Sequence, residues 1–235
     1  MEFIDRENEI IRIMRKLVEG KLDFVVVGGY AVSGLAKHRF SVDCDLVIPS
    51  KELKRVSKLL KDEHFQKLIE KKGFDGIYGG IFVSFVKKVK ELPVNLDLLV
   101  NSLVCRATNA SWSFRYIKKY SLIANIAGIE SSVECRIPEK ELLMAFKIHS
   151  GRRTDLRDII MLREGADLDR VSKHLKRGNI KSLKSQIEKE IEMLEDPNLI
   201  PSLKGVFAIR EDVTRNIDLA RRDLNKLISS LKTFA

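Results

Sequence analysis

Hydrophobic and polar residues follow several different periods along this 235-residue chain. Apolar residues three and four positions apart predict an amphipathic helix over residues 8–18. An apolar run at residues 24–27 predicts a buried strand that leads into a short helix over residues 30–36. Residues 41–48 and 94–100 are apolar stretches interrupted by single polar residues, and both predict strands.

The second half of the pattern is mainly helical. Residues 51–62 and 139–151 predict further helices, and residues 77–89 form a predicted hairpin with the strand that follows them. After residues 163–165, all predicted elements are helices, at residues 168–177, 180–194 and 210–231. The chain is therefore expected to have an α/β (α+β) fold with a mixed sheet and two domains: residues 1–165, and a helical bundle over residues 166–235.

The last predicted helix carries a regular apolar seam. Its members recur at intervals of three and four: Val213, Ile217, Ala220, Leu224, Leu227 and Leu231. Such a seam can pack inside a helical bundle or form a coiled coil between two molecules. Bundle packing is the interpretation favoured by the sequence.

Two acidic residues interrupt the predicted strand at residues 41–48. Because side chains alternate along a strand, Asp43 and Asp45 project from one face while Cys44 points to the other. Like charges at this separation repel each other, and a divalent cation such as Mg²⁺ (or Mn²⁺) relieves the repulsion. Asp97 interrupts the later strand in the same way and is the expected third ligand. The alternatives are a surface turn for the pair and a structural hydrogen bond for Asp97.

A double glycine, Gly28-Gly29, closes the predicted strand at residues 24–27. Glycines allow the backbone to approach a triphosphate closely, and the N–H groups of the following helix favour negative charge. A tight turn alone would explain them equally well. Gly29 and Gly34 have the spacing of a P-loop, but Leu35 and Ala36 stand where such a loop needs Lys and Ser or Thr. Neither GxGxxG nor GxSxG occurs, which argues against kinase, dehydrogenase and simple serine hydrolase chemistry.

Gly28-Gly29, Asp43-x-Asp45 and the later Asp97 together resemble the pattern of the DNA polymerase beta-like nucleotidyltransferase superfamily. The resemblance extends to Arg39 and Ser41 before the acidic pair and to the string KIHSGRRTDLRDI at residues 147–159. These features are similar to the AbiEii-type branch, which includes toxins of type IV toxin–antitoxin systems. The resemblance covers roughly the first two thirds of the chain. One departure is that many superfamily members have Ser after the first glycine, whereas this chain has Gly29 and then Tyr30.

The resemblance implies a polymerase beta-like sheet and a Mg²⁺-dependent transfer of a nucleotide from an NTP. It assigns metal binding to Asp43, Asp45 and Asp97 and places Lys147 in the catalytic set. It implies nucleotide-site roles for the remaining matched residues: Gly28, Gly29, Arg39, Ser41, Arg152, Asp155 and Asp158. Some members of the branch modify tRNA ends, so RNA is the expected acceptor and an antitoxin protein is an expected partner.

Several of these residues have simpler explanations. Arg39 and Ser41 can cap the entrance to a strand, although an Arg suits bidentate recognition of phosphate. Asp155 and Asp158 stand three positions apart on a predicted helix with several arginines nearby, so they can instead form an ion-pair network.

Composition narrows the classes of partner. The formal net charge of +10 favours an anionic partner such as nucleic acid, although lysine- and glutamate-rich surfaces also occur for thermal stability. The three cysteines form no CxxC pair, and the four histidines show no metal-ligand spacing, which argues against zinc. No apolar run has the length of a membrane span, and the acidic amino terminus is unlike a signal peptide, so a cytoplasmic protein is expected.

The sequence thus predicts an enzyme that transfers a nucleoside monophosphate from an NTP to an acceptor, with tRNA or another RNA favoured and a toxin role expected. Two alternatives remain open. The acceptor can be a small molecule or a protein hydroxyl, which predicts a closed acceptor pocket. The chain can also be a binding module that has kept the fold without catalysis, and the intact set of three carboxylates argues against this.

Overall fold

The computed structural model describes residues 2–232, which fold into two compact units. Unit 1 comprises the chain up to Val104 together with Trp112–Pro138, and unit 2 comprises Cys105–Ser111 together with the chain from Glu139 onward. The boundary expected at residues 163–165 lies inside unit 2, between α6 (Arg153–Leu162) and α7 (Leu168–Leu175).

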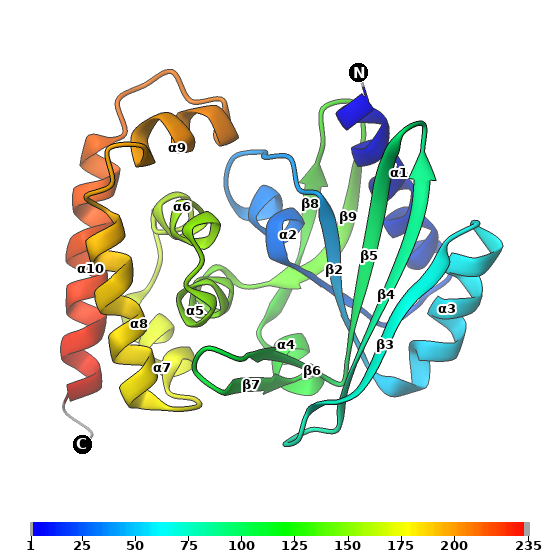
Figure 1. Ribbon diagram of the computed structural model, residues 1–235, viewed down its shortest axis with the longest axis horizontal. Coiled ribbons are helices and arrows are strands. Elements are labelled where there is room, and N and C mark those ends of the chain that lie inside the picture. Colours follow the sequence, from blue (N-terminus) through cyan, green and yellow to red (C-terminus); the bar gives the residue numbers. More distant parts are fainter. Residues whose placement is uncertain (1, 233–235) are drawn as a thin grey trace. The chain divides into compact units, whose positions relative to one another are not determined.

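Unit 1 is built on a five-stranded mixed sheet with the order β1-β2-β5-β4-β3 (Figure 1). Its strands are β1 (Val25–Val27), β2 (Asp43–Ile48), β3 (Gln66–Asp75), β4 (Gly80–Val89) and β5 (Leu92–Val100). β2 and β5 are parallel, and the other neighbouring pairs are antiparallel. A separate antiparallel hairpin is formed by β8 (Ser121–Ala127) and β9 (Ser132–Pro138).

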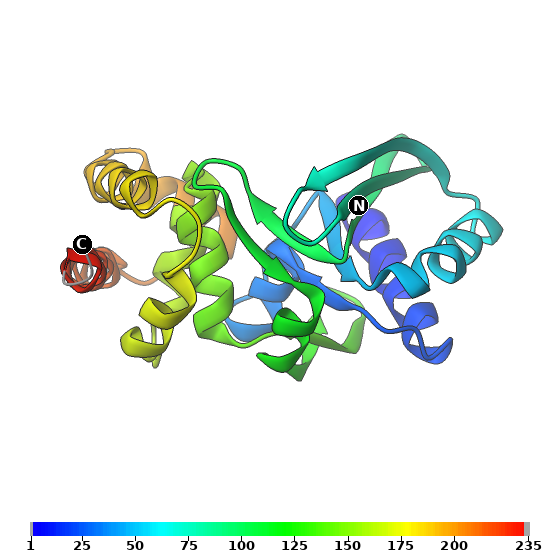
Figure 2. The ribbon, with the colours of Figure 1, turned by 90° about the horizontal axis from the view of Figure 1, so that it is seen from below.

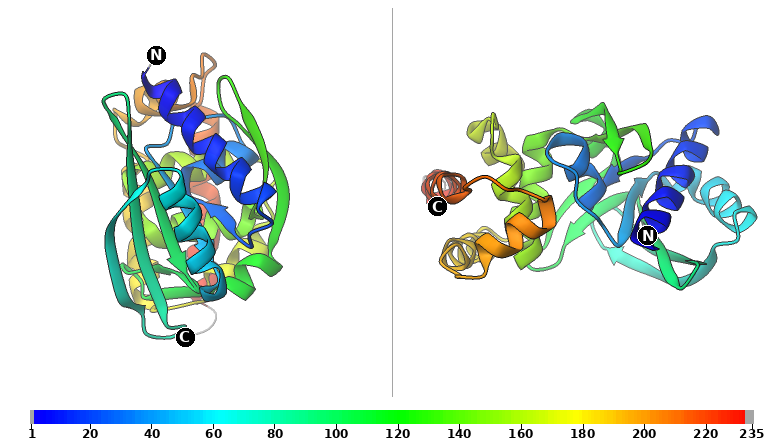
Figure 3. Two further views of the ribbon diagram at one scale, coloured as in Figure 1. Left: turned by 90° about the vertical axis from the view of Figure 1, so that its right-hand side faces the viewer. Right: turned by 90° about the horizontal axis from the view of Figure 1, so that it is seen from above.

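Helices cover this sheet because their apolar faces need burial. The first helix, α1 (Glu2–Glu19), carries a stripe that is fully buried: Ile10, Ile11, Ile13, Met14 and Leu17. It contacts β4, β5 and β9, and it lies on the same face of the sheet as α3 (Leu53–Asp62), as Figure 3 shows. A one-turn 3-10 helix, η1 (Ser50–Glu52), precedes α3. The predicted helix over residues 8–18 is therefore confirmed and is longer than expected at both ends.

The remaining short elements follow the sheet. α2 (Gly28–Leu35) begins directly after β1, and α4 (Phe114–Lys119) follows the two-stranded pair β6 (Ser102–Cys105) and β7 (Ala110–Ser113). The sequence pattern predicted neither β3 nor α4. β3 is an edge strand whose first eight residues are exposed, so the buried apolar face that would have marked it is missing.

Unit 2 contains six helices among its described residues: α5 (Lys140–Ser150), α6, α7, α8 (Ile180–Met193), α9 (Leu199–Phe207) and α10 (Thr214–Lys232). The seam predicted for the last helix is buried at every position, and α10 lies beside α8 (Figures 1 and 2). The seam thus packs within the chain. The predicted mixed α/β class with carboxy-terminal helices is confirmed, whereas α9 was not predicted, and α10 begins four residues later than expected.

The described residues contain no helix that combines the length and the apolar character required to cross a bilayer.

Candidate active site

The three predicted metal-binding carboxylates lie on two neighbouring strands of unit 1. In the parallel pair of β2 and β5, Asp45 is opposite Asp97, and Asp43 is opposite Asn95. All four are half-buried, while the intervening Cys44 and its neighbours on β5 are fully buried on the other face of the sheet. Because residues opposite each other in register point to the same face, the carboxylates share one face of the sheet. The sequence prediction that they lie close together agrees with this register.

Asp43 and Asp97 differ in how the protein satisfies their oxygens. Asn95 Nδ2 donates a hydrogen bond of 2.9 Å to Asp43 Oδ1. Asp97 interacts with Ser84 of β4, but its Oδ1 is buried and has no hydrogen-bond partner. Burial raises the pKa of Asp97 above its usual value, and the charge of Asp43 adds to the rise, although the Ser84 hydrogen bond lowers the pKa. Asp97 is therefore held in its position at an electrostatic cost.

This face can accept a divalent cation without being shaped around one in advance. The described part of the chain contains no three His, Cys, Asp or Glu side chains already spaced as a ligand set. The residues present nevertheless fit such an ion, because Asp97 has an unsatisfied buried oxygen and a pKa raised partly by a second carboxylate. Carboxylate oxygens are the ligands that Mg²⁺ and Mn²⁺ prefer. Asp43, Asp45 and Asp97 are the residues that would hold it.

The double glycine lies directly against these carboxylates. Gly28 has a φ of +67°, and a Cβ built on it would lie 2.2 Å from Asp45 Oδ2. A Cβ on Gly29 would lie 2.5 Å from Ser41 Oγ and 2.8 Å from an Arg39 guanidinium nitrogen. Any side chain at either position would therefore displace a predicted site residue. Close approach therefore favours glycine at both positions, and the positive φ of Gly28 favours it there as well.

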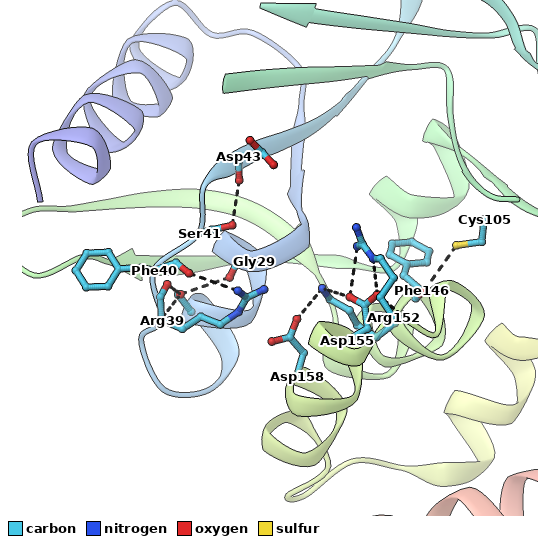
Figure 4. A network of polar contacts seen from close by, with 12 residues as sticks. Gly29, Arg39, Phe40, Ser41, Asp43, Cys105, Phe146, Arg152, Asp155 and Asp158 are labelled. Carbon is cyan, nitrogen blue, oxygen red and sulfur yellow. Dashed lines mark hydrogen bonds and ion pairs between the residues drawn. The ribbon is translucent and has the colours of Figure 1, made fainter. Parts of the chain in front are cut away.

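Arg39 and Ser41 belong to the loop that leads into β2 (Figure 4). Ser41 Oγ donates a hydrogen bond of 3.1 Å to the backbone oxygen of Asp43, and the backbone N–H of Arg39 donates to Ser33 Oγ at 3.3 Å. The bond to Ser33 ties the loop to α2, and the close approach of Ser41 and Arg39 to Gly29 places the loop beside the start of that helix. The first N–H groups of the helix have no acceptor within it. A guanidinium, a hydroxyl and a helix amino terminus thus surround Gly29, which is a suitable arrangement for a phosphate.

The other predicted site residues form a second group, in unit 2 (Figure 4). Lys147 Nζ of α5 lies 2.8 Å from Asp155 Oδ1 and 2.7 Å from Asp158 Oδ2, and all three side chains are buried. Arg152 Nε lies 2.8 Å from the second oxygen of Asp155. Burial alone would raise the pKa of Asp155, but Lys147 and Arg152 outweigh it and lower the pKa. The ion-pair network considered from the sequence is present, and it lies in the interior.

A further buried acid, Glu190 of α8, was not found by sequence analysis. It is fully buried, and neither of its carboxylate oxygens has a hydrogen-bond partner. Burial raises its pKa well above the usual 4.5, and the charge of Asp155 acts in the same direction. Glu190 stands on the same face of α8 as the buried residues Leu183 and Ile187, and this spacing could have indicated from the sequence that it is buried. Asn95 and Ser84 were also missed, although Asn95 shares the alternation of Asp97.

Comparison with known proteins identifies no family. No known family pattern matches the chain, and no curated protein sequence matches it. Among solved structures, JHP933 from Helicobacter pylori aligns with a TM-score of 0.48 and 16% identity, covering 98% of this chain and 94% of its own. The lincosamide antibiotic adenylyltransferase LnuA, bound to lincomycin, aligns with a TM-score of 0.44 and 19% identity, covering 68% of this chain and 98% of its own.

A third match is the antibiotic-resistance factor ANT(2'')-Ia, with a TM-score of 0.43 and 14% identity over 99% of this chain and 97% of its own. Nucleotidyltransferases, to which an adenylyltransferase belongs, are thus among the matched structures. These identities and TM-scores assign no activity, substrate or site residue to this chain. The AbiEii-type resemblance remains a prediction.

The close contact between Gly28 and Asp45 generates a stability prediction. Gly28→Ala combines an unfavourable φ with a collision against Asp45, whereas Gly73→Ala places a Cβ at the same φ of +67° in open space. We expect Gly73→Ala to lower the free energy of unfolding by about 1 kcal/mol and Gly28→Ala to lower it by at least about 1 kcal/mol more. Urea denaturation of both variants measures the difference. Equal losses would show that the contact with Asp45 has no energetic weight.

The buried Glu190 generates a pH-dependent prediction. Folding raises the pKa of Glu190, so the contribution of its protonated form to the free energy of unfolding is fully present below the unfolded pKa of 4.5. This contribution is lost as the pH rises from 4.5 toward the folded pKa, because the unfolded state then loses its proton more readily than the folded state. Glu190→Gln removes this loss and should be more stable than wild type at pH 8, by about 1.4 kcal/mol for each pH unit of the shift. The advantage should vanish at pH 4.

Thermal and urea unfolding at the two pH values measure this effect. Glu188→Gln is the matched control, because Glu188 is exposed on the same helix. A gain from Glu190→Gln that is the same at both pH values, or the same as that of the control, would contradict the assignment of a neutral buried acid.

Proposed function

We propose that this protein transfers a nucleoside monophosphate from an NTP to a hydroxyl group of an acceptor, with release of pyrophosphate, and that the acceptor is RNA. The observation that carries the proposal is the register of β2 and β5, which places Asp45 opposite Asp97 while Gly28 lies against Asp45. This combines carboxylates that fit a divalent cation with a backbone that can approach a triphosphate.

Each part of this arrangement has a role in the proposed reaction. A divalent cation held by Asp43, Asp45 and Asp97 would neutralise the charge that develops on the phosphates. The N–H groups at the start of α2 and the two glycines bind and orient the triphosphate. Arg39, whose guanidinium lies beside Gly29, donates to phosphate oxygens. The acceptor hydroxyl gives up its proton to water and its oxygen bonds to the α-phosphorus. The bond between the α-phosphorus and the oxygen that bridges it to the β-phosphorus breaks, and pyrophosphate leaves with that oxygen.

RNA is the favoured acceptor because of charge. The chain carries 43 Lys and Arg residues against 33 Asp and Glu residues. A basic surface raises both the association rate and the affinity for nucleic acid through phosphate contacts and counterion release. A transfer to tRNA, as in the branch that the sequence resembles, is consistent with this charge. Transfer to a small molecule or to a protein hydroxyl is an outcome that the assay below distinguishes.

The first test is transfer of label from each α-labelled NTP in turn to total tRNA in the presence of Mg²⁺. We expect wild-type protein to label RNA with one preferred NTP. Asp43→Asn/Asp45→Asn should lose at least about a hundredfold in rate, since cation binding contributes several kcal/mol to such reactions. The labelled RNA is measured after gel separation, and NTP binding is measured separately by calorimetry.

The matched control is Asp62→Asn/Asp218→Asn, which removes the same charge from two exposed positions. It should label RNA at the wild-type rate. Label on a protein or a small molecule instead of RNA would overturn the RNA acceptor and retain the transferase. Absence of NTP binding by wild-type protein would overturn the proposed chemistry altogether.

The AbiEii-type toxin role is the most specific part of the proposal. If the transfer inactivates cellular tRNA, induced expression of the wild-type chain in a bacterial host should stop growth, and expression of Asp43→Asn/Asp45→Asn should not. Colony counts after induction measure this, with equal protein levels checked by immunoblot. Equal growth with both proteins would contradict the toxin role and, with it, the need for an antitoxin partner.

A further inference from the structure

Unit 2 contains a basic cavity that the carboxylate site does not use. Its volume is about 590 Å³, and it is lined by Lys176, Arg177, Gly178, Ile180, Lys181, Lys184 and Leu231. These residues come from the connection between α7 and α8, the start of α8 and the end of α10 (Figure 1). Four of the seven are cationic and none is acidic. The volume lies within the range of about 300–1,000 Å³ that is usual for ligand pockets.

Two lysines of this cavity, Lys181 and Lys184, are not neutralised by the part of the protein that the structure describes. Lys181 and Lys184 stand three positions apart on α8 and so lie on the same side of the helix. Among the described residues, neither makes a hydrogen bond or an ion pair with a protein group. Like charges at this spacing destabilise a helix, and they lie at its amino-terminal end, where cations are unfavourable. A bound anion would remove both costs.

The turn that carries this cavity is held in place. Gly178 has a φ of +64°, and a Cβ built on it would lie 2.3 Å from the backbone oxygen of Thr108. The N–H of Asn179 donates a hydrogen bond of 2.7 Å to the same oxygen, and Arg177 Nη1 donates to the backbone oxygen of Ser111 at 3.3 Å. These contacts fix the backbone on which the lysines stand. The cavity is thus formed before any ligand arrives, which lowers the entropic cost of binding.

The cavity also has an apolar part, provided mainly by the half-buried Ile180 beside the edge of Leu231. A small inorganic anion would leave this apolar surface in water. A nucleotide combines a phosphate, which suits the lysines, with a base or sugar that can cover apolar side chains. The first N–H groups of α8 are further donors for a phosphate. The combination fits a nucleotide unit better than a bare anion.

We propose that this cavity binds a phosphate-bearing nucleotide unit of a single-stranded RNA, and so serves as a binding site for the RNA acceptor. The inference rests on the proposed function for the role of the RNA, but the binding itself requires neither NTP nor catalysis. The binding is therefore tested in the Asp43→Asn/Asp45→Asn background with EDTA, so that its failure and a failure of nucleotide transfer are distinguishable.

The test is the fluorescence anisotropy of a labelled ten-nucleotide RNA titrated with the full chain. We expect Lys181→Glu/Lys184→Glu to weaken binding at least tenfold at 100 mM salt. The slope of log K against log salt should become shallower by about 1.4, because two phosphate contacts are lost at about 0.7 each on a single strand. Lys181→Gln/Lys184→Gln should show a smaller loss in the same direction.

The matched control is Lys173→Glu/Lys189→Glu, which reverses two exposed lysines on α7 and α8 outside the cavity. Circular dichroism checks that every variant is folded. Displacement of the RNA by millimolar UMP from wild type would support the proposal. Equal affinity of the two double reversals for RNA would overturn it, and so would binding of free UMP without any binding of RNA.

Discussion

The parallel pairing of β2 with β5 is the constraint on which the candidate site depends. A parallel pair requires a crossover between its strands, and here the connection runs through α3, β3 and β4. The pairing fixes Asp45 opposite Asp97 and brings Asp43 to the same face. A shift of one residue would turn the side chains of β5 to the other face and separate the carboxylates. The register of the sheet thus holds three acidic groups on one face, although their charges repel each other.

The chain stabilises its buried carboxylates in three different ways. Asp155 is paired with Lys147 and Arg152, which lower its pKa despite its burial. Glu190 has no hydrogen-bond partner among the residues that the structure describes, and burial raises its pKa, which favours the neutral form. Asp97 has a single interaction with Ser84 and one unsatisfied oxygen. Burial without a partner normally costs free energy, and at Asp97 the neighbouring carboxylates of β2 offer a way to recover it through an external cation.

Many of the helices and strands, and part of the candidate site, could be predicted from residue patterns. Such a prediction succeeds only where burial follows a regular period. α1, β2 and β5 carry apolar residues at helical or alternating spacing, and they form where expected. β3 consists mainly of exposed residues on a sheet edge, and its sequence QKLIEKKGFD shows no buried face. Asp43 and Asp45 could be found because alternation alone places them together. Asp97 was expected beside them, but the register that places it opposite Asp45 could not be derived, because register depends on contacts distant in sequence.

The sequence also cannot show which charged side chains have a partner in the folded protein. Lys147 is a lysine within an apolar helix, and only the structure shows that it is enclosed by Asp155 and Asp158. Lys181 and Lys184 also stand on a helix, and the sequence alone does not distinguish them from a paired lysine such as Lys147. No protein group neutralises them among the described residues. A charge left without a partner at a fixed position is a cost that a ligand can remove. A cation would stabilise the buried oxygen of Asp97 and an anion would stabilise the two lysines, and the proposed metal-assisted transfer from an NTP to RNA supplies both kinds of counter-charge.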